Sequence, residues 1–261
     1  MPVKPKQRDI IKTLVEQNYL FRDFSKVELA QILDLQDLAI EKLYSNRPIY
    51  TAYRPGLVLQ FLYLVVSGGP VIVRCSPLDR IIAIHYPGAC FGPESLPIGF
   101  GPTSRGFPSL VEAYKTTDVV KVPVSKVQQL YEKDQGFCDR YNLLFELRQK
   151  FQYHLLNCST YPPQAVAALL RALIYQEREL GSQPDAAQTY RFDLPLDLIA
   201  LASQLNQRTV EQVLKGMRQN GLIETAHSSD LSGDMIRVLD PEGMKEIYST
   251  TRDKVSWWPL K

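Results

Sequence analysis

The stretch QLNQRTVEQVLKGMRQNG, from position 204 to 221, combines an apolar helix face with a face of hydrogen-bond donors. At 3.6 residues per turn the apolar side chains share one face: Val210, Val213, Leu214 and Met217. The long polar side chains share the opposite face: Arg208, Gln212, Lys215 and Gln219. Guanidinium, ammonium and amide groups can donate to the phosphates and base edges of DNA. An ordinary solvated helix would show the same two faces, so the neighbouring elements must decide between these interpretations.

Those neighbours favour a DNA-binding motif. The segment LDLIALASQL predicts a helix directly before this one, and LIETAHS and MIRVLD predict two strands joined by the turn SDLSGD. Two helices followed by a β-hairpin form a winged helix-turn-helix, whose second helix lies in the major groove. Gln204 stands in the turn, where the backbone wants positive φ and glycine is usual. Glu211 would lie near phosphate, and is favourable mainly if it accepts a hydrogen bond from cytosine.

A longer helix precedes this region. From Asp134 to Cys158 the large residues recur in steps of four and three, with Arg148 as the polar interruption. The spacing predicts the seam of a helix pair, and we expect a homodimer interface that includes four of these residues: Tyr141, Leu144, Phe151 and Leu155. Packing of the same face against the chain's own β-domain is the alternative. Two prolines in STYPPQ end the helix.

The rest of the chain supplies an α+β frame. Helical spacing occurs in IIKTLVEQ and in SKVELAQILDLQDLAIEKL, where Ser25 and Glu28 form a predicted capping box. Short β-rich runs separated by Pro and Gly fill 47–124 and predict an antiparallel barrel or sandwich. The helix AVAALLRALIYQEREL and the loop GSQPDAAQTY come next. We expect three parts: an effector domain at 1–124, a dimerisation helix at 125–160 and a winged helix-turn-helix domain at 161–261.

Composition excludes several classes of protein. The 30 basic residues nearly balance the 28 acidic ones, so a DNA-binding surface must be local. The segment MPVKPKQRDI lacks the apolar run of a signal peptide, and no stretch reaches the roughly 18 apolar residues of a membrane span. We therefore expect a cytoplasmic protein.

The residue types that bind metals or perform catalysis are sparse. The four cysteines are Cys75, Cys90, Cys138 and Cys158. They are widely spaced without a CxxC pair, which predicts reduced thiols and no metal site. The three histidines have no acid or nucleophile at a helpful spacing, and neither a Gly-rich phosphate loop nor HExxH occurs. We expect neither an enzyme nor a cofactor.

These motifs together resemble the Crp/Fnr family of bacterial transcription regulators over nearly the full chain. YLFRDFSKVEL is similar to the family's entry helices, LYLVVSGGPVIV to its β-roll strands, and RTVEQVLKGMRQNGLIE to its recognition helix and wing entry. The resemblance implies an N-terminal antiparallel β-roll (jelly-roll-like) effector domain, a long dimerisation helix and a C-terminal winged helix-turn-helix. It also implies double-stranded DNA, a second copy of the chain and RNA polymerase as partners.

Carried over residue by residue, the family's base-reading positions fall on Gln207, Arg208 and Gln212, and its backbone contacts on Thr209 and Lys215. With the residues predicted from the helix faces, the DNA-binding set is Gln207, Arg208, Thr209, Glu211, Gln212, Lys215 and Gln219. The usual Arg-Glu-Thr…Arg set is altered here, which implies a different preferred DNA sequence.

The effector pocket departs further from the family pattern. Cyclic-nucleotide binders of this fold use a Gly-Glu pair and an Arg followed by a small hydroxyl residue; here Pro93 follows Gly92, Glu94 is displaced by one, and Gly106 follows Arg105. The helix from Asp134 to Asn157 also lacks Ser and Thr. We therefore expect a pocket degenerate for cAMP.

Two other functions stay open. The chain could be a ligand-gated regulator that still binds a cyclic nucleotide or another small molecule through Glu94 and Arg105. Alternatively, the winged helix could dock a protein instead of DNA.

Overall fold

The computed structural model describes residues 7–33, 38–45, 47–51, 60–75, 79–99, 109–156, 161–225, 234–250 and 255–258. The chain divides into two compact units, the first formed by 1–79 and 83–148 and the second by 80–82 and 149–261. The boundary at 148/149 lies within helix α4 (Gln135–Leu156), which contributes residues to both. The predicted boundaries at 124/125 and 160/161 differ from it, and the three-part division stays a prediction.

Two helices precede the strands of the first unit, α1 (Gln7–Gln17) and α2 (Lys26–Ile32). The predicted capping box is present at the start of α2. Ser25 Oγ accepts from the backbone N–H of Glu28 at 3.2 Å, and Glu28 Oε2 accepts from the backbone N–H of Ser25 at 2.9 Å. This reciprocal pair satisfies two backbone donors that the helix itself leaves without partners.

The second helical run ends earlier than the sequence predicts. The helix expected through AIEKL stops at Ile32, and Ala39–Leu43 forms strand β1, which pairs antiparallel with strand β8 (Thr117–Pro123). The local spacing permits a helix, but the ladder with β8 satisfies the backbone of 39–43 in an extended form. Tertiary pairing therefore overrides the local preference here.

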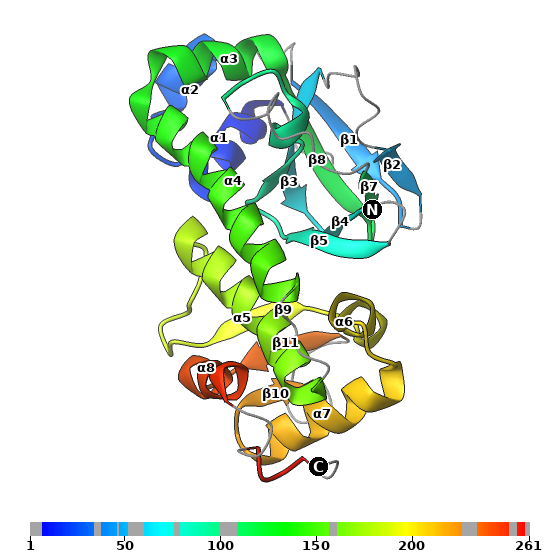
Figure 1. The fold of residues 1–261 in the computed structure, drawn as a ribbon. Helices are drawn as coiled ribbons and strands as arrows, with labels where there is room; N and C mark the ends of the chain where they lie inside the picture. Colours follow the sequence, from blue (N-terminus) through cyan, green and yellow to red (C-terminus); the bar gives the residue numbers. More distant parts are fainter. Residues whose placement is uncertain are drawn as a thin grey trace. The chain divides into compact units, whose positions relative to one another are not determined.

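Within the described residues, the strands of the first unit form two four-stranded sheets, in the orders β1-β8-β3-β6 and β2-β7-β4-β5 (Figure 1). The remaining strands are β2 (Pro48–Thr51), β3 (Phe61–Ser67), β4 (Val71–Cys75), β5 (Arg80–His85), β6 (Cys90–Phe91) and β7 (Ser109–Ala113). Their inward side chains are almost fully buried, as at Leu62, Leu64, Val73, Val111 and Val120. The antiparallel β-domain is confirmed, and β1, which lies before the β-rich run at 47–124, adds to it.

The chain leaves the β-domain through helix α3 (Val124–Lys133) and enters α4 after Asp134. Asp134 is extended, at φ −122° and ψ 111°, and therefore separates the two helices. Its carboxylate Oδ1 accepts a hydrogen bond from the backbone N–H of Phe137, which caps the start of α4. The predicted long helix is confirmed, and it begins at Gln135.

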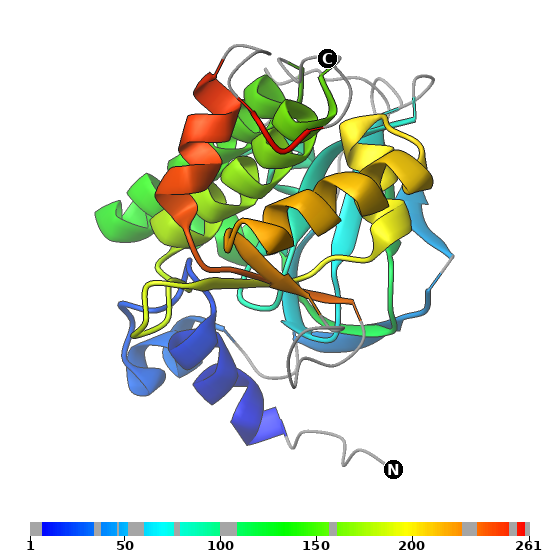
Figure 2. The same ribbon diagram turned by 90° about the horizontal axis from the view of Figure 1, so that it is seen from below.

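In the second unit, helix α5 (Pro162–Leu180) lies at the centre of the packing. Its alanines and leucines are buried, and it packs against α8 (Pro241–Ser249), α6 (Leu196–Ser203) and α7 (Gln207–Gln219). Figure 2 shows α5 and α8 side by side. Small alanine side chains allow neighbouring helices to approach closely, which explains the alanine-rich sequence of α5.

A three-stranded sheet in the order β10-β11-β9 completes this unit. It comprises β10 (Ile223–Thr225), β11 (Met235–Val238) and β9 (Tyr190–Asp193), all paired antiparallel. The predicted hairpin strands are confirmed; its turn at 226–233 lies outside the described residues. Strand β9 and helix α8 were not expected from the sequence, although Asp240 before Pro241 is a typical helix start. Each helix in the described part of the chain is too short or too polar to span a bilayer.

Candidate nucleic-acid interface

Helices α6 and α7 meet at a tight turn. Gln204 lies in the left-handed region, at φ 57° and ψ 35°, and its backbone N–H donates to the carbonyl of Ala200. The backbone N–H of Leu205 donates to the same carbonyl at 3.0 Å. The turn therefore has the positive φ that the motif requires, adopted by glutamine instead of glycine. A non-glycine residue bears a steric cost in this region, of about 1–2 kcal/mol.

The start of α7 is fixed by a side-chain cap. Asn206 Oδ1 accepts a hydrogen bond from the backbone N–H of Thr209 at 2.8 Å. Behind the cap, Val210, Val213 and Met217 are 0% exposed. The predicted apolar face is thus confirmed as the packing face, and α7 lies against α5 and α6. The orientation of the opposite face follows from this packing.

The opposite face of α7 is solvent-exposed. Of the predicted contact residues, Thr209 is half-buried. The other six are exposed: Gln207, Arg208, Glu211, Gln212, Lys215 and Gln219. Among the residues that the structure describes, none of these six side chains forms a hydrogen bond or an ion pair with another side chain. Their donors are therefore available to an external ligand, and Arg208 and Lys215 give the face two positive charges against one negative charge from Glu211.

The far end of α7 is joined to the sheet. Arg218 Nη1 donates to Thr225 Oγ1 of β10 at 3.2 Å, and Asn220 Nδ2 donates to the carbonyl of Gly216 at 2.8 Å. The first of these contacts links the helix to the first strand of the predicted wing. The hydrogen bond from Arg218 to Thr225 therefore holds α7 and β10 together at this end of the helix.

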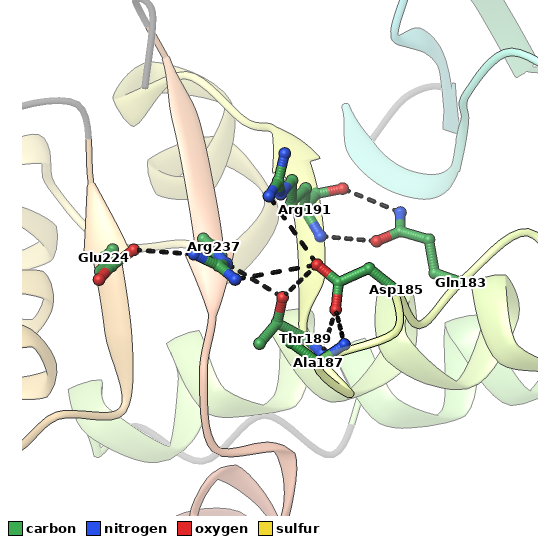
Figure 3. A network of polar contacts seen from close by, with 7 residues as sticks. All are labelled: Gln183, Asp185, Ala187, Thr189, Arg191, Glu224 and Arg237. Carbon is green, nitrogen blue, oxygen red and sulfur yellow. Dashed lines mark hydrogen bonds and ion pairs between the residues drawn. The ribbon is translucent and has the colours of Figure 1, made fainter. Parts of the chain in front are cut away.

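A polar network holds the loop after α5 against the same sheet (Figure 3). Asp185 Oδ1 accepts from the backbone N–H groups of Ala187 at 3.0 Å and Thr189 at 2.9 Å, and Oδ2 accepts from Thr189 Oγ1 at 2.7 Å. The hydrogen bonds from Thr189 lower the pKa of the Asp185 carboxyl. Arg237 of β11 donates to Thr189 Oγ1 at 3.0 Å and pairs with Glu224 of β10 at 3.5 Å. The loop is therefore an ordered part of the unit, which its composition did not predict.

One of the predicted ligand residues of the first unit, Glu94, is already paired with another side chain. Gly92 adopts φ 96° and precedes a short 3₁₀ helix, η1 (Pro93–Ser95). Glu94 in η1 forms an ion pair with Arg148 of α4, and their side chains are 12% and 19% exposed. Tyr141 Oη donates to the carbonyl of Pro93 at 3.1 Å. Arg105, the other predicted ligand residue, lies outside the described residues.

No protein-family model matches the sequence, and no curated protein matches it. Several solved structures, however, are similar to this chain. FixK2 from Bradyrhizobium japonicum aligns with a TM-score of 0.58 and 17% identity, over 82% of this chain and 98% of that one. A CooA mutant from Carboxydothermus hydrogenoformans aligns with a TM-score of 0.57 and 16% identity, over 87% and 97%. Both are regulators of the Crp/Fnr family. The chain has the Crp/Fnr fold.

In this Crp/Fnr fold, the predicted seam residues of α4 differ in burial. Tyr141 is 0% and Phe151 1% exposed in the single chain, so both pack within it. Leu144 and Leu155 are half-buried, and Tyr153 is 63% exposed. The alternative interpretation, packing against the chain's own β-domain, agrees with the hydrogen bond from Tyr141 to Pro93, whereas Phe151 is buried as part of the second unit. The homodimer stays a prediction, and a second copy could contact only the part of α4 that remains exposed.

The histidine and thiols in the β-domain of the Crp/Fnr fold are buried to different degrees. Cys75 and Cys90 are buried free thiols, and burial raises the pKa of Cys90 to about 12. His85 is half-buried, and desolvation of its ring, followed by the charge of Arg148, lowers its pKa to about 3. Cys158 lies outside the described residues. Among the described residues, no cluster of three or more potential metal ligands occurs.

The role of Arg148 was missed from the sequence, although the residue stood out as the interruption in an apolar seam. A charged residue at such a position needs an opposite charge nearby, because an unpaired buried charge is costly. That signal could have indicated an acidic partner, although it could not have named Glu94, which lies 54 positions away in the sequence. Only the fold brings the two together.

Proposed function

We propose that this chain is a transcription regulator of the Crp/Fnr family and binds double-stranded DNA through α7. The exposed face of α7, next to α6 across a left-handed turn, is the observation that carries the proposal. Its donors are of the kinds that read base edges and bind phosphates. The fold it shares with FixK2 and CooA supports the proposal.

The residues of α7 divide into two roles. Arg208 and Gln212 lie one turn apart near the start of the helix, where side chains reach base edges. Lys215 lies further along and would contact phosphate. Arg208→Ala should therefore weaken binding to the preferred site by about 1–3 kcal/mol and relax selectivity at one base pair. Lys215→Ala should weaken binding to all sequences similarly and reduce the salt slope by about one unit.

The experiment begins with selection of bound fragments from genomic DNA by the purified protein, which reports the preferred site. Fluorescence anisotropy on that site and on a scrambled duplex, at several salt concentrations, then measures the affinities of both variants. Lys26→Ala, a change on an exposed residue of α2 in the other unit, is the control and should have no effect. If Arg208→Ala and Lys215→Ala both bind DNA as the parent does at low salt, α7 does not enter the groove. The protein-docking alternative would then replace this proposal.

Glu211 provides a further test of the same face. It is an exposed acid that lies between Arg208 and Gln212 in the sequence. If it reads cytosine, Glu211→Ala loses affinity at one base pair only; if it merely lies near the backbone, the variant gains affinity for every sequence.

We further propose that the protein acts as a homodimer through the exposed part of α4. Tyr153, which is 63% exposed, and Leu144, which is half-buried, are the large side chains that support this. Leu144→Asp would place a charge in such an interface without disturbing the buried Tyr141 or Phe151. Sedimentation should show a fall from twice the chain mass to the chain mass at micromolar concentration. An unchanged mass would exclude this face.

We also propose that the effector site does not take cAMP. Glu94 and Arg148 already form an ion pair, so the carboxylate is not free for a ribose hydroxyl. Titration calorimetry with cAMP and cGMP should give no heat at micromolar protein. A micromolar dissociation constant for either nucleotide would instead favour a ligand-gated regulator.

A further inference from the structure

The segment from Val255 to Trp258 packs against the flank of α7. A Cβ atom built on Gly216 would lie 2.3 Å from Cε3 and 2.4 Å from Cζ3 of Trp257. These distances are far below van der Waals contact, so no side chain larger than hydrogen fits while the indole keeps its place. The indole therefore lies directly on the backbone of the helix.

Gly216 is present for space and not for backbone conformation. It lies inside α7 and is absent from the residues with positive φ. Glycine within a helix is less favourable than alanine, because it loses more backbone freedom on folding. The contact with Trp257 gives a physical reason for glycine at this position, because only glycine admits the ring.

The same segment is anchored by its neighbours. Trp258 is 4% and Val255 8% exposed, and the backbone N–H of Trp258 donates to the carbonyl of Val255 at 3.2 Å. The two indole rings meet edge to face, with centroids 6.3 Å apart and planes at 87°. These are the two tryptophans of the chain. The segment is thus a compact turn with a buried anchor, and Trp257 projects from it onto α7.

The place of contact matters for the exposed face of α7. Gly216 is adjacent to Lys215 and lies one turn from Gln212 and Gln219, on the flank between the exposed face and the buried face. A ring at that position limits rolling of the helix about its axis. Such rolling would move the exposed donors away from any surface that they bind.

We propose that Trp257 is a positioning residue for α7, and that the turn Val255–Trp258 holds the helix in the orientation in which it binds DNA. Gly216 is the position on which the ring rests. Trp257 acts through the helix and does not itself bind phosphate. This inference rests on the proposed function, because it assigns the residue that orients the same interface.

The main test compares Trp257→Ala with Gly216→Ala in the full-length protein. Each removes the ring from its place, so each should weaken binding to the selected DNA site by about five- to tenfold through lost preorganisation. The salt slope should stay that of the parent, whereas Lys215→Ala reduces it by about one unit. The double variant should bind like Trp257→Ala alone, because the methyl group added at position 216 then meets no ring. Gly136→Ala, in α4, is the matched helical control and should bind like the parent.

A second readout is independent of DNA. In a Trp258→Phe background Trp257 is the sole indole, and Gly216→Ala should shift its emission to longer wavelength by exposing it to water. Urea unfolding should show that Gly216→Ala lowers the unfolding midpoint of the parent but raises that of the Trp257→Ala protein, because alanine is the better helix former once the ring is gone.

These outcomes separate the two proposals. If the parent binds DNA but Trp257→Ala and Gly216→Ala bind equally well, the positioning role is wrong. A fall in the salt slope of Trp257→Ala would also overturn it, because that result indicates a lost phosphate contact. If the parent binds no DNA, the proposed function fails, and the fluorescence and unfolding results still decide whether Trp257 rests on Gly216.

Discussion

The ion pair between Glu94 and Arg148 allows a sharp test of the first unit. Glu94→Gln keeps the shape of the side chain and removes its charge, which leaves the guanidinium of Arg148 without this partner. Loss of one partner costs about 3–5 kcal/mol in a fully buried pair and about 0–1 kcal/mol in an exposed pair. With 12% and 19% of the side chains exposed, this pair lies nearer the buried limit. We expect the free energy of unfolding to fall by about 2–3 kcal/mol.

A double-mutant cycle measures the interaction itself. Arg148→Met replaces the guanidinium with an apolar side chain, and Glu94→Gln/Arg148→Met removes both charges together. The double variant should be less destabilised than the sum of the single variants, by about 2 kcal/mol, because no charge is then left unpaired.

Urea unfolding followed by circular dichroism gives these free energies. The control is the exposed pair Lys26–Glu16, whose side chains are 51% and 48% exposed at an N–O distance of 2.9 Å. The cycle Glu16→Gln/Lys26→Met should give a coupling below about 1 kcal/mol. A coupling for Glu94 and Arg148 no larger than that of the control would show that the ion pair contributes nothing in solution. Glu94 would then be free to bind a ligand, and the proposal of a site closed to cAMP would lose its basis.

Two further predictions concern the second unit. Gln204→Gly should raise the free energy of unfolding by about 0.5–1 kcal/mol in urea titrations: glycine relieves the left-handed strain, although its greater freedom in the unfolded chain offsets part of this gain. The control Gln219→Gly, in α7, should lower the free energy of unfolding by about 1 kcal/mol. A fall in both variants would refute the strain at Gln204. Burial raises the pKa of Glu177 above 4.5, so the native state favours the protonated acid and stability is lost as pH rises through the native pKa. Glu177→Gln should therefore be more stable than the parent at pH 7, and thermal melts should show that this advantage vanishes below pH 4.5. If the variant is still more stable below pH 4.5, its advantage does not come from removal of the carboxylate charge.

Features set by near neighbours in the chain were predictable. The capping box of Ser25 and Glu28 depends on residues three positions apart, and the two faces of α7 on a period of 3.6. The positive φ of Gln204 follows from its place between two helices. These interactions are local, so a short window of sequence contains all the groups that form them.

Other features depended on residues far apart in the sequence. Strand β1 was predicted as helix because AIEKL has helical spacing, and only the ladder with β8, more than 70 residues later, makes it extended. Short strands such as β6 and β9 likewise acquire their form from pairing. A backbone can satisfy its hydrogen bonds in either form, so the partner strand decides.

The sequence by itself determined the helix-turn-helix, the β-rich region and the long helix between them, because periodicity and turn residues encode these elements locally. The tertiary structure decided which polar groups meet. Arg148 meets Glu94 across 54 positions of sequence, and Trp257 meets Gly216 across 41. Each pairing depends on how whole helices and strands pack. A buried charge or a missing side chain at one position indicates that a partner is needed, but it does not specify which residue that partner is.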